Sequence, residues 1–226
     1  MHETAVKICG LQDVEVLKSM INLPVDYIGF VFAPSKRQIS AAQGANLLQV
    51  LSTWKSANRP ESVGVFVNPT VEELAQVLNI AALDVVQLHG EESPEFCREV
   101  KERFRVKVIK AFAVKRDGTL HGGAADVDAI EAYHGAIDGV LIDAYDPVYG
   151  GGAGRTFTWE EAKPIQAWAK REELPFLVAG GLHGDNVRDL IAVLDPDGVD
   201  VSSGVETNGI KDPSKISAFV ERVKSR

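Results

Sequence analysis

The chain has 226 residues, of which 45% are hydrophobic and 25% charged. These proportions are close to those of soluble globular domains and exclude disordered and fibrous classes. No apolar run approaches the roughly 18 residues of a transmembrane helix, and no charged segment followed by an apolar one marks a secretory signal. The net charge of −8, with scattered Lys and Arg, argues against binding to a nucleic-acid backbone. A pocket for a small anion needs only local positive potential, so a protein that binds a small anionic ligand is not excluded.

The chain has two cysteines, Cys9 and Cys97, whose placement does not indicate a disulfide framework. We therefore expect a reduced, cytoplasmic protein with no membrane partner. Its five histidines have no metal-ligand spacing, and no metal is predicted.

Short apolar runs rich in β-branched residues recur along the chain, and segments with helical periodicity lie between several of them. The runs are almost continuously apolar rather than alternating, which is typical of parallel strands covered by helices. Strands are predicted over residues 6–10, 27–32, 62–67, 85–90, 108–113, 139–144, 176–182 and 198–205.

The intervening segments have helical signals. In one of them Glu73 follows Thr70 by three residues, the spacing of a capping box. Pro164 predicts a kink or a later start in another. Helices are predicted over residues 70–81, 92–104, 158–172, 185–194 and 213–223.

Eight strands in 226 residues give about 28 residues per βα unit, which fits a (β/α)₈ barrel. We predict an α/β protein with a single (β/α)₈ TIM barrel domain over residues 1–226. An open doubly wound sheet would begin with a glycine-rich phosphate loop after its first strand, but the turn here reads CGLQD. The longest irregular stretch, residues 143–158, follows the sixth strand and is predicted to be an active-site loop.

Catalytic groups of such barrels lie at the C-terminal ends of the strands. Cys9 ends the first strand, and Lys7 lies on the same face of it. Since helices cover the outer face, we expect Lys7 inside the barrel below Cys9, where it favours the thiolate. The alternative for Cys9 is an inert buried thiol. Cys97 is predicted to be structural.

Three further side chains fall at strand ends or in the loops that follow them. Asp143 ends the sixth strand, where a carboxylate is costly unless used or paired, and is predicted to be catalytic; the alternative is a loop cap. Because Leu141 is apolar, we expect Asp143 to stand alone above a core layer. Arg37 lies shortly before a predicted helix start at Ser40. Its guanidinium can bind a carboxylate bidentately, and the alternative is a solvated surface arginine. His89 is either a substrate contact or a hydrogen-bonded strand-end histidine.

Two glycine turns follow the seventh and eighth strands, AGGL at residues 179–182 and SSGVE at residues 202–206. Barrels that bind phosphate do so at these turns, where glycine lets backbone N–H groups approach the oxygens. Ordinary turn glycines are the alternative. The predicted phosphate-binding residues are Gly180, Gly181, Ser202, Ser203 and Gly204. The glycine run at residues 150–154 is predicted to close over the ligand, with Gly152 and Gly154 contacting it.

The motifs VKICG, YIGFVF followed by SKRQIS, GVFVN, VVQLHG, VLIDA, GGAGRTFTW, VAGGL and VDVSSGVE occur in this order over residues 6–206. They resemble the motifs of the phosphoribosylanthranilate isomerase family of tryptophan biosynthesis, whose members are (β/α)₈ barrels. The family's loop reads GGTG followed by FDW, whereas this chain has Ala153 and Thr158 there. Lys36 precedes the arginine where many relatives have proline.

The resemblance implies a cofactor-free Amadori rearrangement of N-(5′-phosphoribosyl)anthranilate into 1-(o-carboxyphenylamino)-1-deoxyribulose 5-phosphate. By this resemblance Asp143 is the general acid, Cys9 the general base, and Arg37 the partner of the anthranilate carboxylate. The turns around Gly181 and Ser203 hold the phosphate. The implied partner is a small phosphorylated molecule, and both a monomer and a homodimer are open.

Two alternatives belong to other functions. A related isomerase of histidine biosynthesis, acting on a phosphoribosyl aminoimidazole, has a carboxylate where this chain has Cys9 and an internal twofold repeat that this sequence lacks. The second alternative is a catalytically silent phosphate-binding barrel, which would bind its ligand without turnover. Cys9 and Asp143 occupy both proton-transfer positions, which weighs against this alternative.

Overall fold

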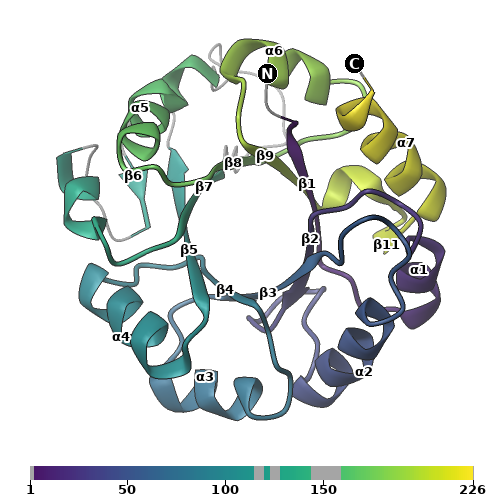
Figure 1. Ribbon diagram of the computed structural model, residues 1–226, viewed down its shortest axis with the longest axis horizontal. Coiled ribbons are helices and arrows are strands. Elements are labelled where there is room, and N and C mark those ends of the chain that lie inside the picture. The colour runs from purple at the N-terminus through teal and green to yellow at the C-terminus, as the bar shows by residue number, and fades with distance from the viewer. Residues whose placement is uncertain (1–2, 115–119, 123–127, 144–158, 226) are drawn as a thin grey trace.

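The computed structural model describes residues 3–114, 120–122, 128–143 and 159–225. Eight parallel strands form a ring with helices outside it (Figure 1). They are β1 (Ala5–Cys9), β2 (Tyr27–Val31), β3 (Glu61–Phe66), β4 (Val85–Leu88), β5 (Lys107–Val114), β7 (Gly139–Asp143), β8 (Phe176–Ala179) and β9 (Gly198–Val201). The ring closes because β4 pairs with β5 and β1 pairs with β9. The predicted (β/α)₈ TIM barrel is confirmed.

Helices follow most strands and cover the outside of the ring (Figure 1). The α-helices are α1 (Val14–Ser19), α2 (Ala41–Leu51), α3 (Val71–Leu78), α4 (Pro94–Phe104), α5 (Lys163–Arg171), α6 (Val187–Leu194) and α7 (Pro213–Lys224). Between β5 and β7 the described residues form the short strand β6 (Leu120–His121), antiparallel to β5, and the 3₁₀ helix η1 (Asp128–Tyr133). Within the described part of the chain, no helix combines the length and apolarity that crossing a membrane requires.

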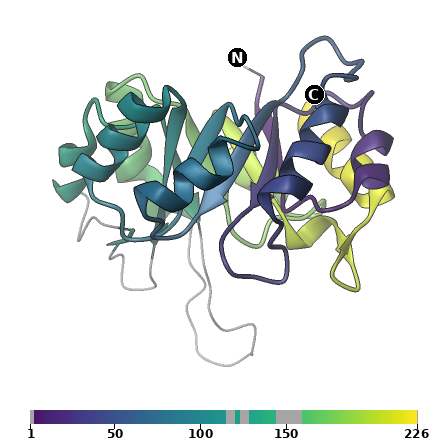
Figure 2. The same cartoon turned by 90° about the horizontal axis from the view of Figure 1, so that it is seen from below.

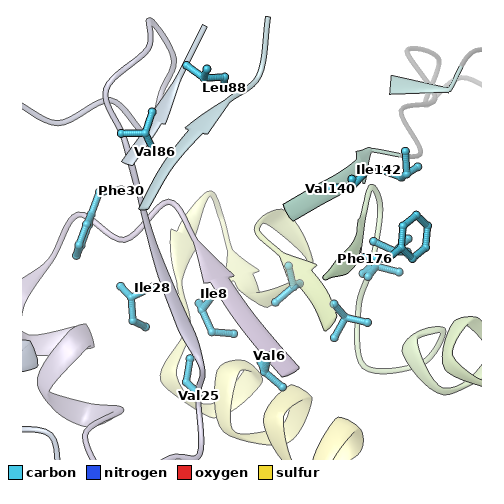
Figure 3. Close-up of a cluster of buried hydrophobic side chains, with 14 of the residues drawn as sticks. Val6, Ile8, Val25, Ile28, Phe30, Val86, Leu88, Val140, Ile142 and Phe176 are labelled. Carbon is cyan, nitrogen blue, oxygen red and sulfur yellow. The ribbon is translucent and has the colours of Figure 1, made fainter. Parts of the chain in front are cut away.

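The two faces of the strands bury different sets of side chains. The outward face packs under the helices with large aliphatic and aromatic residues, among them Val6, Ile8, Ile28, Phe30, Val86, Leu88, Val140, Ile142 and Phe176 (Figure 3). The inward face fills the barrel with a smaller cluster, made of Val63, Val85, Ile109, Ala111, Leu141, Leu177 and Ala179. Both faces are therefore apolar, which explains why the strands read as continuous rather than alternating runs.

Helix starts agree with the capping signals. Thr70 caps α3 in a complete capping box, accepting from the Glu73 N–H while the Glu73 carboxylate accepts from the Thr70 N–H. Ser40 and Gln43 form the same arrangement at α2. Ser93 caps α4, which therefore begins two residues later than the predicted segment. In each case a side-chain oxygen satisfies a backbone donor that the first helical turn leaves free.

Two predicted strands run too long. The strand predicted over 176–182 ends at Ala179, because Gly180 and Gly181 have φ angles of 93° and 61°, outside the β region. The strand predicted over 198–205 ends at Val201 and is followed by the 3₁₀ helix η3 (Ser203–Val205). In both places the predicted range included the glycine or serine turn that follows the strand.

The predicted later start beside Pro164 is confirmed. The 3₁₀ helix η2 (Trp159–Ala162) comes first, and α5 then begins at Lys163 with Pro164 in its first turn. Proline is tolerated there because the first helical N–H groups have no intrahelical partner. Thr158, the predicted first residue, lies outside the described residues. Helix α1 was not predicted, since its six residues are too few for a periodic pattern.

The two ends of the barrel are distinct. Figure 2 shows that β1 begins and α7 ends on the same side of the ring. All eight strands run in parallel, so their C-terminal ends, with the loops that follow them, gather on the opposite side. The predicted site residues of β1, β4, β7, β8 and β9 therefore share one face of the molecule.

Removing the cap of α3 is expected to destabilise the fold. Thr70→Ala leaves the Glu73 N–H without its acceptor and should lower the free energy of unfolding by about 1 kcal/mol. Thr70→Ser keeps the hydroxyl and is the matched control, expected to stay close to the parent. Urea unfolding followed by circular dichroism measures both, and equal losses in the two variants would contradict the capping account.

Candidate active site

The C-terminal ends of the strands surround a cavity of about 420 Å³. Most of the predicted site residues line it, namely Cys9, Arg37, His89, Asp143, Gly180, Gly181, Ser202 and Ser203. Gly152 and Gly154 lie outside the described residues. A larger hollow of about 920 Å³ opens at the other end of the barrel, between α5 and the starts of β8 and β9. We place the site in the smaller cavity, because side chains at strand C-termini converge there.

Lys7 lies where the sequence predicts it, in the barrel below Cys9. It is fully buried, and its Nζ donates to Asp200 Oδ2 on the neighbouring strand β9 at 2.9 Å. Burial alone would lower the pKa of Lys7, but the charges of Asp200 and Cys9 raise it above its ordinary value. Lys7 is therefore a permanent cation beneath the thiol. Asp200 was missed, although a carboxylate inside the apolar run GVDV gives the same signal that marked Asp143.

The pKa of Cys9 is set by opposing effects. Burial raises the pKa of the Cys9 thiol above its ordinary value; Lys7 lowers it, but by less, and Asp200 opposes Lys7. Lys7 therefore favours the thiolate, as predicted, although the net shift of the Cys9 pKa is upward.

Asp143 does not stand alone, contrary to the expectation. His89 Nε2 lies 3.3 Å from Asp143 Oδ2, and His89 Nδ1 is 2.9 Å from the Gln87 amide nitrogen. With that amide donating, Nδ1 is an acceptor and a neutral ring carries its proton on Nε2, facing the carboxylate. His89 is thus a hydrogen-bonded histidine that also lines the cavity, so the two interpretations of it are compatible.

Arg37 is held by a carboxylate of the chain itself. Its Nε and Nη2 donate to the two oxygens of Glu206 at 2.6 and 2.9 Å, a bidentate geometry. Lys211 Nζ donates to Glu206 Oε1 at 2.8 Å and to the Ser202 carbonyl at 2.8 Å. Burial raises the pKa of Glu206, but the bonds from Arg37 and Lys211 outweigh it and lower the pKa to about 2.

Neither Glu206 nor Lys211 was identified as part of the site from the sequence. Both are buried, and they lie on the short hairpin strands β10 (Glu206–Thr207) and β11 (Ile210–Lys211). The hairpin places the two charges against Arg37, which belongs to the loop after β2. Long-range pairing of this kind leaves no local pattern in the sequence.

The two glycine turns pack directly on each other. Gly204 cannot be replaced without movement, because a Cβ there would lie 1.9 Å from the Leu182 carbonyl oxygen. Ser202 Oγ donates to the Cys9 carbonyl at 3.1 Å and so connects the second turn to β1. Gly204 itself does not line the cavity. Glycine is required at position 204 because the two turns are in contact there.

Two residues that line the cavity each have a buried acceptor without a hydrogen-bond partner among the described residues, Asp200 Oδ1 and Gln87 Oε1. Buried polar atoms are normally satisfied, so these two atoms are exceptions in the ligand-free arrangement. In the part of the chain that the structure describes, no three His, Cys, Asp or Glu side chains are grouped to hold a metal ion.

Comparison with known proteins gives one consistent family. Residues 6–222 match the family model described as N-(5′-phosphoribosyl)anthranilate (PRA) isomerase. A Brevibacillus brevis protein named N-(5′-phosphoribosyl)anthranilate isomerase is 47% identical over 98% of this chain and 94% of its own length. A Listeria welshimeri protein of the same name is 41% identical over 97% and 98% of the two chains.

Solved structures agree with this result. The phosphoribosylanthranilate isomerase from Thermotoga maritima superimposes with a TM-score of 0.77 at 34% identity, covering 99% of this chain and all of that one. A second structure of such an isomerase, in complex with reduced 1-(o-carboxyphenylamino)-1-deoxyribulose 5-phosphate, has a TM-score of 0.75 at 32% identity with the same coverage.

Glu206 should make the stability depend on pH in acid. Its pKa falls from 4.5 to about 2 on folding, so its stabilisation is complete above its unfolded pKa and is lost as the pH falls through the folded one. Across that interval the free energy of unfolding of the parent is expected to fall by about 2–3 kcal/mol more than that of Glu206→Gln.

Urea unfolding at a series of pH values measures this difference. Glu102→Gln, on the exposed side of α4, is the control and should follow the parent. If the free energy of unfolding depended on pH in the same way in the parent and in Glu206→Gln, the proposed contribution of Glu206 would be contradicted.

Proposed function

The chain belongs to the N-(5′-phosphoribosyl)anthranilate isomerase family, and from this premise we propose which of its residues carry the reaction. The enzyme is an aldose–ketose isomerase of tryptophan biosynthesis. It rearranges N-(5′-phosphoribosyl)anthranilate to 1-(o-carboxyphenylamino)-1-deoxyribulose 5-phosphate. The observation that carries the assignment of residues is that one cavity joins a thiol and a carboxylate with an arginine and two glycine turns.

Asp143 acts as the general acid and Cys9 as the general base. Asp143 protonates the furanose ring oxygen, the C1′–O bond breaks, and the anthranilate nitrogen lone pair forms the Schiff base. Cys9 then removes the C2′ proton, and the electrons of that bond form an enolamine. The C2′ hydroxyl loses its proton as C1′ gains one, which gives the ketone. The product is an isomer of the substrate, and every step moves a proton or shifts an electron pair within the substrate, so no oxidant or reductant enters the scheme.

The reaction needs a protonated Asp143 and a Cys9 thiolate. Burial raises the pKa of the Cys9 thiol, so its surroundings have to stabilise the thiolate. Lys7, charged beneath Cys9, stabilises the thiolate when it forms. Activity therefore requires a single proton on the pair and declines when both groups or neither is protonated.

The remaining residues bind the substrate. Arg37 keeps N–H groups that Glu206 does not use, and these bind the anthranilate carboxylate. The turns with Gly180, Gly181, Ser202, Ser203 and Gly204 hold the phosphate through backbone N–H groups. His89 contacts the substrate beside Asp143, and Gly152 and Gly154, outside the described residues, stay predicted contacts.

The proposed setting of the enzyme is the cytoplasm, with the small phosphorylated substrate as its partner. Both a monomer and a homodimer are compatible with this site, because every residue assigned to it belongs to one chain. Analytical ultracentrifugation distinguishes the two states.

Replacing either proton-transfer group should abolish most of the activity. Cys9→Ser and Asp143→Asn are each expected to reduce kcat by at least about a hundredfold, because a general acid or base contributes about 10²–10⁴. The loss of phosphoribosylanthranilate fluorescence measures turnover. Cys97→Ala is the control for Cys9→Ser, since Cys97 is a buried residue of α4 in the outer core, and it should keep the parental kcat.

The outcomes separate the alternatives. A folded parent that binds the substrate without turnover would replace the isomerase with a silent phosphate-binding barrel. Turnover that survives both substitutions would leave the reaction in place and overturn the roles of Cys9 and Asp143.

Removing the guanidinium of Arg37 should weaken substrate binding. Arg37→Met is expected to raise KM by about ten- to a hundredfold, since a charge-assisted hydrogen bond contributes about 1.5–3 kcal/mol. Arg59→Met is the control: Arg59 also binds a carboxylate, its Nη2 donating to both oxygens of Asp84, but at the opposite end of the barrel. Steady-state kinetics with both variants test the assignment, and an unchanged KM in Arg37→Met would refute it.

A further inference from the structure

Lys110 is a lysine buried where the fold otherwise places apolar residues. Its neighbours Ile109 and Ala111 face the inside of the barrel, whereas Val108 and Phe112 belong to the outer core. Lys110 therefore points outward from β5, under the covering elements, and its side chain is 0% exposed. A buried ammonium is costly unless it is paired and hydrogen-bonded, so its contacts matter.

The Lys110 ammonium binds the end of the neighbouring strand β4. Its Nζ donates to the carbonyl of Gly90 at 2.8 Å and lies 3.3 Å from that of Leu88. It also donates to the Ala111 carbonyl of its own strand at 2.9 Å. The buried carboxylate of Glu92 neutralises it, with Oε2 at 3.1 Å. Three carbonyl oxygens and one carboxylate therefore surround a single cation.

Glu92 extends these contacts to two further segments. Its Oε1 accepts from the Asn68 N–H, after β3, at 2.8 Å, and its Oε2 accepts from the Gly90 N–H at 2.9 Å. Its carbonyl accepts from the buried hydroxyl of Tyr133, in η1, at 2.8 Å. The turn at residues 88–92 is thus fixed from β5, from the loop after β3 and from η1.

His89 lies in the middle of this fixed turn. Lys110 binds the carbonyls of the residues on either side of it, and the His89 N–H donates to the Phe66 carbonyl at 2.8 Å. The imidazole points the other way, with Nε2 3.3 Å from Asp143 Oδ2. Because β4, β5 and β7 are consecutive in the ring (Figure 1), Lys110 acts on the outer side of the same strands whose ends carry His89 and Asp143.

We propose that Lys110, paired with Glu92, is a positioning residue of the isomerisation, which holds the 88–92 turn so that His89 stays against Asp143. The inference rests on the proposed role of Asp143 as general acid. Stability alone accounts poorly for such a pair, since apolar replacements of buried ion pairs are often neutral or stabilising. Geometry accounts for it better, because a cation with four acceptors fixes the path of the turn in a way that an apolar side chain does not.

Lys110→Met tests the proposal, because methionine keeps much of the side-chain volume without the charge. We expect kcat to fall by about ten- to a hundredfold, in line with the cost of a displacement of about 1 Å in a catalytic group. KM should change by a smaller factor than kcat, since Arg37 and the glycine turns, which hold the two charged ends of the substrate, are not involved. Lys107→Met is the matched control: Lys107 lies on the same strand and also pairs with a glutamate, Glu61, but at the other end of the barrel. It should keep the parental kcat.

A double-mutant cycle separates positioning from general support of the fold. In a His89→Gln background, Lys110→Met should reduce kcat by less than about twofold, because the residue through which it acts is gone. The same loss of kcat in both backgrounds, or an unchanged kcat in the single variant, would overturn the proposal. If Lys110→Met does not fold, the cycle uses Lys110→Met with Glu92→Gln, which leaves no unpaired buried charge.

A second readout is independent of turnover. The imidazole ¹⁵N and ¹³C signals of His89 in the ligand-free protein should shift in Lys110→Met and stay unchanged in Lys107→Met. Asp143→Asn, assayed beside them, tests the proposed function by itself. If that variant kept its activity, the general-acid role would fall, and unchanged His89 signals in Lys110→Met would overturn the positioning separately.

Discussion

The ion pair between Lys7 and Asp200 spans the place where the barrel closes. β1 is the first strand of the ring and β9 the last, and these two side chains face each other across their junction at 2.9 Å. No disulfide joins the two strands, so the ladder, this ion pair and the hydrogen bond from Ser202 to the Cys9 carbonyl hold them together. The active cavity lies directly above, and Cys9, Ser202 and Asp200 all line it. Closure of the fold and the electrostatics of the thiol therefore depend on the same two charges.

Three ion pairs of the described residues each join segments distant in sequence. Lys7 with Asp200 joins β1 to β9, Lys110 with Glu92 joins β5 to the turn after β4, and Arg37 with Glu206 joins the loop after β2 to the hairpin after β9. Each pair lies at or just behind a strand end that carries a site residue. Apolar packing shapes the barrel, and these polar contacts determine how its loops are placed. The division is physical, because dispersion and burial are non-directional whereas hydrogen bonds are directional.

The sequence alone predicted the barrel, its eight strands to within a few residues and most residues that line the cavity, since these depend on local composition and on the rule that strand ends carry the chemistry. It also placed Lys7 correctly, because an outward lysine would meet the helices. It did not yield the contact of His89 with Asp143, the pair of Arg37 with Glu206 or the net effect of burial on Cys9. These depend on pairs of residues far apart in the chain and on solvent exclusion, which no local pattern encodes.

The carboxylate of Glu206 has a consequence for how an anion is selected. It already accepts both donors of one edge of Arg37 and one from Lys211, so the nearby positive charge is partly cancelled before any ligand arrives. The chain as a whole has a net charge of −8, which repels anions at long range. With the proposed binding roles, an anion is then selected at contact, because a carboxylate and a phosphate at the correct separation satisfy Arg37 and the glycine turns at once.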